Sequence, residues 1–286
     1  MHRCHLKKQA AAQDHPETTI TTRKEEKQVE ERVAIGPQVV YETIRREGEE
    51  ELSRTVTALA WSGLAAGLSI GFSFLAQALL WAHLPDQPWR PLITALGYCV
   101  GFLIVILGRQ QLFTENTLTV ILPLLLKKNA KVGLQVLRLW ATVLTANIAG
   151  TFLFALVVAR TAMFGAATHA AMTSIALAHT GQPFALSFLR AVFAGWLIAL
   201  MVWLLPGADA SRISIIIIIT YLVGLGGLNH IVAGSTTVLF LVASGSLPLT
   251  SYLFGFLIPT LLGNIVGGVS LVAALGHAQV KGGKEA

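Results

Sequence analysis

The chain has 286 residues, of which 54% are hydrophobic and only 13% are charged, and its mean hydropathy is +0.65. A soluble domain of this size does not need so much apolar sequence for its core, so the composition identifies a membrane protein. The net charge of +6 is explained by membrane topology, and no nucleic-acid partner is inferred from it. The two cysteines, Cys4 and Cys99, lie far apart and predict no disulfide framework.

Residues 1–54 form a polar N-terminal segment with ten Lys/Arg and eleven Asp/Glu residues. The first 19 residues lack the apolar core of a signal peptide and are expected to be disordered. From residue 23, charges of both signs alternate with Val and Ile at helical intervals, which predicts a short charged helix on the cytoplasmic side. The simplest interpretation is a solvated helix with no function of its own.

Residues 55–280 are expected to form one transmembrane domain, followed by a cytoplasmic tail at 281–286. A helix of about 20 apolar residues spans the roughly 30 Å hydrocarbon core. Six such runs follow one another in this all-α domain: 56–81, 92–126, 133–159, 185–206, 213–243 and 248–275.

The loops of this domain differ in positive charge. The loops after the second and fourth runs, with the residues beside them, carry Lys127, Lys128, Lys131, Arg138 and Arg212, whereas the other side has only Arg90, Arg160 and Arg190. Cytoplasmic loops are enriched in Lys and Arg, so both termini are predicted to be cytoplasmic.

The second run is interrupted by 108-GRQQLFTEN-116, which carries Arg109 and Glu115 near mid-depth. Each charge buried without a partner would cost at least ~2.5 kcal/mol in a membrane, so these groups should face protein or an aqueous cavity. Asn, Thr and Gly are poor interior helix formers, which favours a discontinuous helix. Arg109 and Glu115 could form a buried ion pair that brackets the loop, or could contact a substrate directly.

The fifth run is interrupted in the same way by GLGGLNHIVAG, where His230 is the one side chain between residues 213 and 243 whose ordinary pKa lies near neutrality. Breaks in the second and fifth of six spans indicate an inverted repeat of three plus three helices, with a site at the midplane. The alternative is that both are kinked helices packed through glycine. The sixth run adds Asn264, an amide at a similar depth, which could also serve as an interhelical hydrogen-bonding group.

Four motifs carry a resemblance to a known family: LAAGLSIG in the first run, LFTEN at 112–116, the Asn229-His230 pair followed by Ala233, and LIPTLLGNIVGG in the sixth run. Together, and in this order, they resemble the formate/nitrite transporter family of bacterial membrane channels, from about Leu64 to Leu275. The resemblance implies an aquaporin-like fold, a homopentamer with one pore in each protomer, and a place in the lipid bilayer of the bacterial cytoplasmic (inner) membrane.

The resemblance also assigns residues to the pore. It implies that Thr114 faces His230 at the centre of the pore. Further pore or substrate contacts are expected from Gln111, Glu115, Asn116, Asn229 and Asn264, and apolar constrictions from Tyr98, Phe102, Leu112, Phe113 and Val223.

The chain departs from the family pattern at several of these positions. It has Asn229 where Glu is usual, Gly234 and Gly195 where Asn is usual, and Gln111 where an acidic residue is common. His179 aligns with a Lys at the outer mouth of the pore. These departures leave the identity of the transported ion open.

The function implied is transport of small monovalent anions of weak acids, without a cofactor, a metal or catalytic residues. An unperturbed imidazole has a pKa near neutrality, so His230 could hand a proton to an entering anion, with Thr114 orienting the ring. A neutral His230 hydrogen-bonded within the broken helix is the simpler alternative.

The alternatives to transport are a membrane scaffold, an intramembrane hydrolase and a metal transporter. The charged N-terminal segment would suit a membrane scaffold of the same fold that has lost transport. An intramembrane hydrolase would need Ser235 or Ser244 as nucleophile with His230 as base, but neither serine lies in a G-x-S-x-G turn. A metal transporter is disfavoured because His230 has no second ligand at suitable spacing.

Overall fold

The computed structural model describes residues 35–208 and 210–282, and every regular element in these two ranges is helical. Residues 1–34, which include the predicted disordered start at 1–19 and the beginning of the predicted charged helix, lie outside the described residues. The first half contains α2 (Pro37–Ser53), α3 (Val56–His83), α4 (Arg90–Leu107), α5 (Phe113–Thr119), α6 (Ile121–Lys127) and α7 (Ala130–Arg160). The second half contains α8 (Ala166–Leu177), α9 (Phe184–Leu204), the 3₁₀ turn η1 (Leu205–Gly207), α10 (Arg212–Leu225), α11 (Ile231–Ala243), the π-helical turn η2 (Ser251–Leu257) and α12 (Ile258–Gly282).

Within the described ranges, five helical stretches are long and apolar enough to cross a membrane. They are α3, α4, α7, α9 with η1, and η2 with the first part of α12. The sixth predicted span is made by two shorter apolar helices in tandem, α10 and α11. The six-span, all-α fold expected from the sequence is therefore confirmed.

The second and fifth spans are discontinuous, as predicted, and their breaks have the same construction. Each break is five residues long, 108–112 between α4 and α5 and 226–230 between α10 and α11. Its second residue has a left-handed backbone, with φ 51° at Arg109 and φ 57° at Gly227. Its third residue donates its N–H to a carbonyl five residues earlier, at 3.0 Å for Gln110 and 3.1 Å for Leu228. These are helix ends closed by a left-handed turn, so the breaks are more than kinks.

Two asparagines complete the correspondence between the halves. Asn147 on α7 accepts the N–H of Phe113 at 2.9 Å, and Asn264 on α12 accepts the N–H of Ile231 at 2.8 Å. These two N–H groups belong to the first residues of α5 and α11 and have no partner within their own helices. The amide groups of Asn147 and Asn264 therefore fix both half-helices to the last long helix of their own repeat.

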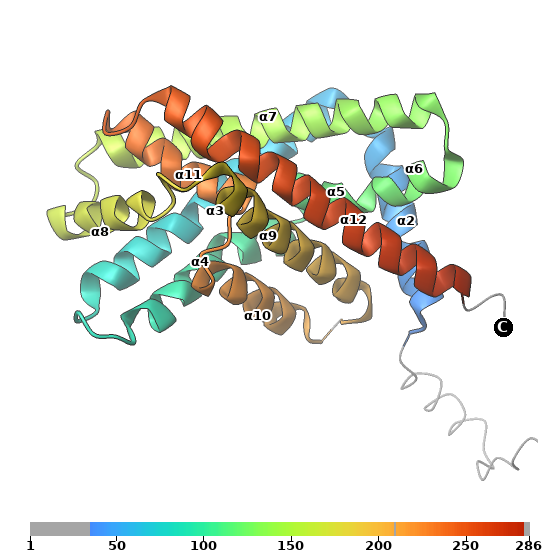
Figure 1. The fold of residues 1–286 in the computed structure, drawn as a ribbon, viewed down its shortest axis with the longest axis horizontal. Helices are drawn as coiled ribbons and strands as arrows, with labels where there is room; N and C mark the ends of the chain where they lie inside the picture. The colour runs from blue at the N-terminus through green and yellow to red at the C-terminus, as the bar shows by residue number, and fades with distance from the viewer. Residues whose placement is uncertain (1–34, 209, 283–286) are drawn as a thin grey trace, which may run out of the picture. The chain divides into compact units, whose positions relative to one another are not determined.

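Glycines allow the long helices of each repeat to cross closely at these asparagines. A Cβ atom on Gly67 of α3 would lie 2.2 Å from the Asn147 carbonyl oxygen, and a Cβ atom on Gly195 of α9 would lie 2.4 Å from the Asn264 carbonyl oxygen. Any larger residue would force the helices apart. Gly195, one of the departures from the family pattern, thus has a packing role. Figure 1 shows α12 running alongside α9 in the same way that α7 runs beside α3.

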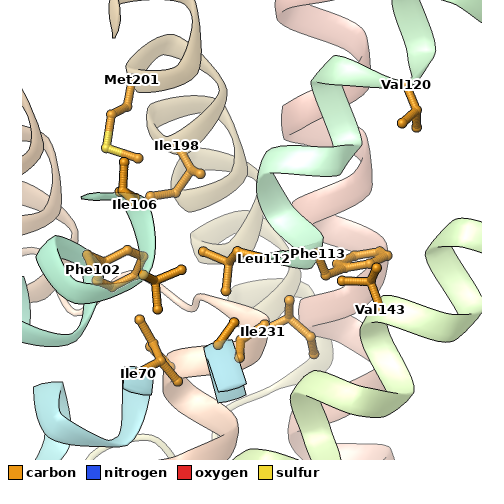
Figure 2. Packing of buried hydrophobic residues seen from close by; sticks show 14 of the residues in the cluster. Ile70, Phe102, Ile106, Leu112, Phe113, Val120, Val143, Ile198, Met201 and Ile231 are labelled. Atoms are coloured by element: carbon orange, nitrogen blue, oxygen red, sulfur yellow. The ribbon is translucent and has the colours of Figure 1, made fainter. Parts of the chain in front are cut away.

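The main core lies around the two breaks (Figure 2). Phe102 of α4, Leu112 of the first break and Ile231 of α11 are each at most 1% exposed. In Figure 2, Phe113 lies beside Val143 of α7, and its ring also meets that of Trp140 edge to face, with 5.8 Å between centroids. The ends of the breaks that lead into α5 and α11 are therefore packed in this core, whereas the turns at Arg109 and Gly227 lie nearer its edge.

Candidate functional site

The two breaks bring Thr114 and His230 together, 116 residues apart in sequence. Thr114 is the second residue of α5 and His230 caps the N-terminus of α11. Thr114 Oγ1 lies 2.7 Å from His230 Nε2, and both side chains are fully buried. Between the second and fifth spans, this pair is the one hydrogen bond that joins two side chains among the described residues.

The hydrogen bonds of His230 determine which ring nitrogen carries hydrogen. The backbone N–H of Ala233 donates to Nδ1 at 3.1 Å, so Nδ1 must be the unprotonated nitrogen. The neutral ring then carries its hydrogen on Nε2 and donates it to Thr114 Oγ1. The Thr114 hydroxyl keeps its own hydrogen, which is available to a third group. The centre of the site therefore presents donors.

Aromatic and aliphatic side chains surround this pair. The Phe102 ring meets the His230 ring edge to face with centroids 5.0 Å apart, and Tyr98 packs against Phe102 at 5.2 Å. Val223 and Leu112 are fully buried in the same cluster. Phe113 belongs to the same cluster, and its ring also packs edge to face against Trp140 on α7.

Asn264 is fully engaged with backbone groups. Its amide donates to the carbonyls of Ala191 and Asn229 at 2.7 and 2.9 Å, while its oxygen accepts the N–H of Ile231. Both amide hydrogens are used, so this side chain positions the break. Asn147, which sequence reasoning did not single out, makes the equivalent bonds to the carbonyls of Gly63 and Gln111, at 2.8 and 2.9 Å.

On the α2 side of the breaks, the amides of Gln111 and Asn116 meet each other and a carboxylate from α2. Asn116 Nδ2 donates to Gln111 Oε1 at 3.1 Å and to Glu51 Oε2 at 3.0 Å. Gln111 Nε2 donates to Glu51 Oε1 at 3.3 Å. Glu51 was not predicted as a site residue, because in sequence it is one of eleven acidic residues in the polar N-terminal segment.

Arg109 and Glu115 do not form the ion pair considered from the sequence. The Arg109 side chain is 80% exposed and its guanidinium lies 3.7 Å from Glu47 of α2. Glu115 Oε1 is buried without a hydrogen-bond partner among the described residues. The left-handed turn at Arg109 directs its side chain outward, which sequence spacing does not reveal.

On the other side, His179 and Asn229 form a similar contact. His179 follows α8, and its Nδ1 lies 3.4 Å from Asn229 Oδ1. Burial lowers the pKa of His179, which keeps this imidazole uncharged at neutral pH. A neutral histidine thus stands at the position that the sequence comparison aligns with a lysine of the family pattern.

The space beside His230 is filled by an aromatic ring. A Cβ atom on Gly234 would lie 2.4 Å from Phe256 Cζ, so Phe256 occupies the volume where the family pattern places an Asn. Ser235 donates to the Ile231 carbonyl at 2.5 Å and also lies 2.9 Å from the Tyr252 hydroxyl. Ser235 is therefore hydrogen-bonded to Ile231 and Tyr252, and His230 is hydrogen-bonded to Thr114 and Ala233. The serine and histidine do not form the nucleophile–base pair that a hydrolase would need.

These features define a class: a membrane protein built from an inverted repeat, whose two broken helices meet at one buried polar pair within an apolar cluster. Residues 38–278 match the model of the family described as formate/nitrite transporter. An inner membrane protein of Escherichia coli, YfdC, is 42% identical over 253 residues, covering 88% of this chain and 81% of that protein. The chain belongs to the formate/nitrite transporter family.

More distant relatives and solved structures agree with this assignment. The formate channel BtFdhC of Bacillus thuringiensis is 26% identical over 82% of this chain and 92% of its own length. A structure described as a pentameric formate channel with formate bound superposes with a TM-score of 0.63 at 20% identity, over 82% of this chain and 98% of that one. One described as an FNT family ion channel gives 0.73 at 18% identity, over 85% and 99%. These likenesses support the shared fold.

Proposed function

We propose that this protein is a transmembrane channel for small monovalent weak acids of the formate and nitrite type. The observation that carries the proposal is the buried Thr114–His230 pair, which offers hydrogen-bond donors in the middle of an apolar constriction. A route lined only by Phe102, Leu112 and Val223 would present no polar group to a substrate. A bare anion there would face a desolvation penalty on the order of tens of kcal/mol.

The donors are arranged for an oxygen-bearing substrate. The His230 Nε2–H bond polarises the Thr114 hydroxyl, whose hydrogen can be donated to an oxygen of a carboxylic acid or of nitrous acid. Protonating His230 on Nδ1 would break its bond to the Ala233 N–H and leave that buried donor unpaired, at a cost of about 1–3 kcal/mol. The proton therefore travels with the substrate, and His230 stays neutral.

The remaining features of the proposal concern assembly and placement. We propose a homopentamer in the cytoplasmic (inner) membrane of a bacterium, in agreement with the descriptions of a pentameric formate channel and of an inner membrane relative. Both termini are placed in the cytoplasm by the distribution of Lys and Arg. The face that carries α2 is then cytoplasmic, and the face that carries His179 is outside.

A flux panel tests this function. Purified protein in liposomes would be exposed to inward gradients of formate, nitrite, acetate and chloride at several pH values, with uptake and internal pH recorded together. The proposal predicts uptake of the small weak acids that increases as pH falls, and no uptake of chloride, whose acid is fully ionised. Membrane insertion without flux of any weak acid would instead favour a scaffold of the same fold.

A further inference from the structure

The two mouths of the repeat carry corresponding side chains of different chemistry. Glu51 lies twelve residues before Gly63, whose carbonyl accepts from Asn147, and Glu51 accepts from the amide of Gln111 in the first break. His179 lies twelve residues before Ala191, whose carbonyl accepts from Asn264, and His179 meets the amide of Asn229 in the second break. Gln111 and Asn229 are both the fourth residues of their breaks. Glu51 is thus the counterpart of His179, with an acid in place of a base.

The hydrogen-bond partners of Glu51 are all donors, and donors favour its ionised form. Asn116 Nδ2 and Thr119 Oγ1 donate to Oε2 at 3.0 and 2.5 Å, and Gln111 Nε2 donates to Oε1 at 3.3 Å. All three contacts are donors, and a carboxylate needs no hydrogen of its own to satisfy them. In its ionised form, Glu51 places a negative charge against Gln111 and Asn116, on either side of Thr114.

The position of α2 holds this charge in place. A Cβ atom on Gly48 would lie 2.0 Å from the Thr119 carbonyl oxygen, so the helix rests directly on α5. Arg138 of α7 donates to the Leu52 carbonyl at 2.7 Å and to the Arg54 carbonyl at 3.2 Å, which anchors the end of α2. Glu51 is therefore fixed to the transmembrane domain and is not part of a loose tail.

A cavity of about 440 Å³ opens beside this carboxylate, on the face that carries α2. Its wall includes Glu51 of α2, together with Gln111 and Glu115, which lie just before and just after Leu112 and Phe113 in the chain. Glu115 adds a second carboxyl group, one oxygen of which has no partner among the described residues. On the proposed route, a substrate that leaves Thr114 toward this face would pass these groups.

Both signs of charge are therefore disfavoured along the proposed route, cations at its centre and anions at its α2-side mouth. The Thr114 and His230 hydrogens at the centre disfavour a cation. The carboxylate of Glu51 at the mouth disfavours an anion. We propose that Glu51 is a specificity-determining residue of the transport route, which excludes the ionised form of the substrate at the α2-side mouth so that a weak acid passes there only as the uncharged acid. This inference rests on the proposed function and specifies the form of the substrate.

Glu51 also makes the exclusion dependent on pH. Burial raises the pKa of Glu51, and the three hydrogen bonds that it accepts oppose this shift only in part. Because the pKa is raised, the charge is present well above it and is lost under milder acidity than for an exposed Glu. The titratable and charged groups around this carboxylate, in the cavity wall and on the packed helices, are Glu47, Glu50, Arg54, Arg109, Glu115, Arg138 and Arg212.

The test measures the two forms of the substrate separately. Full-length protein in liposomes is given a formate gradient at pH 7.5, with internal pH reporting entry of formic acid and a voltage-sensitive dye reporting movement of formate as an ion. The wild type is expected to acidify the lumen with little dye response. Glu51→Gln keeps a side chain of the same shape and should raise the ratio of anion to acid flux on the order of tenfold, since a charge within several ångströms is removed.

Controls separate this effect from general changes. Glu42→Gln removes the same charge from a side chain of α2 that is paired with Arg45 and Arg46 outside the cavity wall, and it should leave the ratio at the wild-type value. Glu51→Asp keeps the charge and should keep the exclusion. If Glu51→Gln does not assemble, the wild type alone decides: its anion flux should rise as the pH is lowered through the Glu51 pKa.

The failures of the two proposals are distinguishable. The role of Glu51 is overturned, with the proposed function left in place, if the wild type carries weak acids and Glu51→Gln has the same ratio of anion to acid flux. The same conclusion follows if the anion flux of the wild type does not change with pH. A wild type that carries no weak acid in either form overturns both.

Discussion

Substitutions of His230 by Asn and Gln separate the two hydrogen bonds that this ring makes. In side-chain geometry, an Asn oxygen occupies roughly the place of Nδ1 and a Gln amide nitrogen roughly that of Nε2. His230→Asn therefore keeps an acceptor for the Ala233 N–H and loses the donor to Thr114, whereas His230→Gln does the reverse.

The magnitudes follow from these bonds. Loss of the N-terminal cap of α11 in His230→Gln should cost about 1–2 kcal/mol of stability, or a fall of a few degrees in the unfolding midpoint. The Gln amide still donates to Thr114 at the centre of the site. Because a change in one hydrogen bond is worth about 1 kcal/mol, weak-acid flux should stay within about tenfold of the wild type. His230→Asn should keep the helix capped and lose more flux than His230→Gln.

The assay combines thermal unfolding of the purified protein with formate uptake into liposomes between pH 5 and 8. A neutral His230 predicts that His230→Gln keeps the pH profile of the wild type, because that profile reports the fraction of uncharged acid. A profile that flattens in His230→Gln would show that the imidazole itself titrates during transport, and would refute the assignment of a neutral ring.

Three further predictions follow from packing and backbone geometry. Asn264→Leu leaves the Ile231 N–H and two carbonyls unpaired and should cost about 3–5 kcal/mol, measured as loss of folded protein in detergent. Gly234→Ala places a methyl group 2.4 Å from the Phe256 ring and should destabilise by about 1–3 kcal/mol, with recovery in the double variant with Phe256→Leu; additive losses would argue against this contact. Arg109→Gly relieves a left-handed backbone at an exposed position and should raise the free energy of unfolding by up to about 1 kcal/mol, seen as a slightly higher unfolding midpoint. A lower midpoint would contradict the assignment of strain.

The general fold could be predicted from the sequence because membrane spans depend on composition over long windows. Breaks in the second and fifth spans were visible as polar and glycine-rich stretches inside apolar runs. The helix α8 and the π-helical turn before α12 were not predicted. α8 is only twelve residues long, shorter than a span, and a π turn has no distinct composition.

The centre of the site was predicted more completely than its supports. Thr114 and His230 could be paired through a family resemblance, and the structure places them in contact. Asn147 and Glu51 were missed for physical reasons. Asn147 is an isolated amide in the apolar middle of α7. Glu51 contacts residues 60 or more positions away, which only the docking of α2 reveals.

Hydrogen-bond direction was also beyond the sequence. A histidine at mid-depth suggested a proton donor, because an unperturbed imidazole titrates near neutrality. The backbone N–H of Ala233 points at Nδ1, and this single bond favours a neutral ring. The left-handed turn at Arg109 likewise removed the expected ion pair with Glu115.

Removal of the Thr114 hydroxyl tests the account most directly. Thr114→Val keeps the shape of the side chain and deletes the hydroxyl at the centre of the route, and Thr236→Val is a matched control, since Thr236 is equally buried and its hydroxyl has no partner among the described residues. In liposomes at pH 6, formate uptake should fall about tenfold or more in Thr114→Val and stay at the wild-type rate in Thr236→Val. Equal uptake in the wild type and in Thr114→Val would contradict a channel centred on Thr114 and His230.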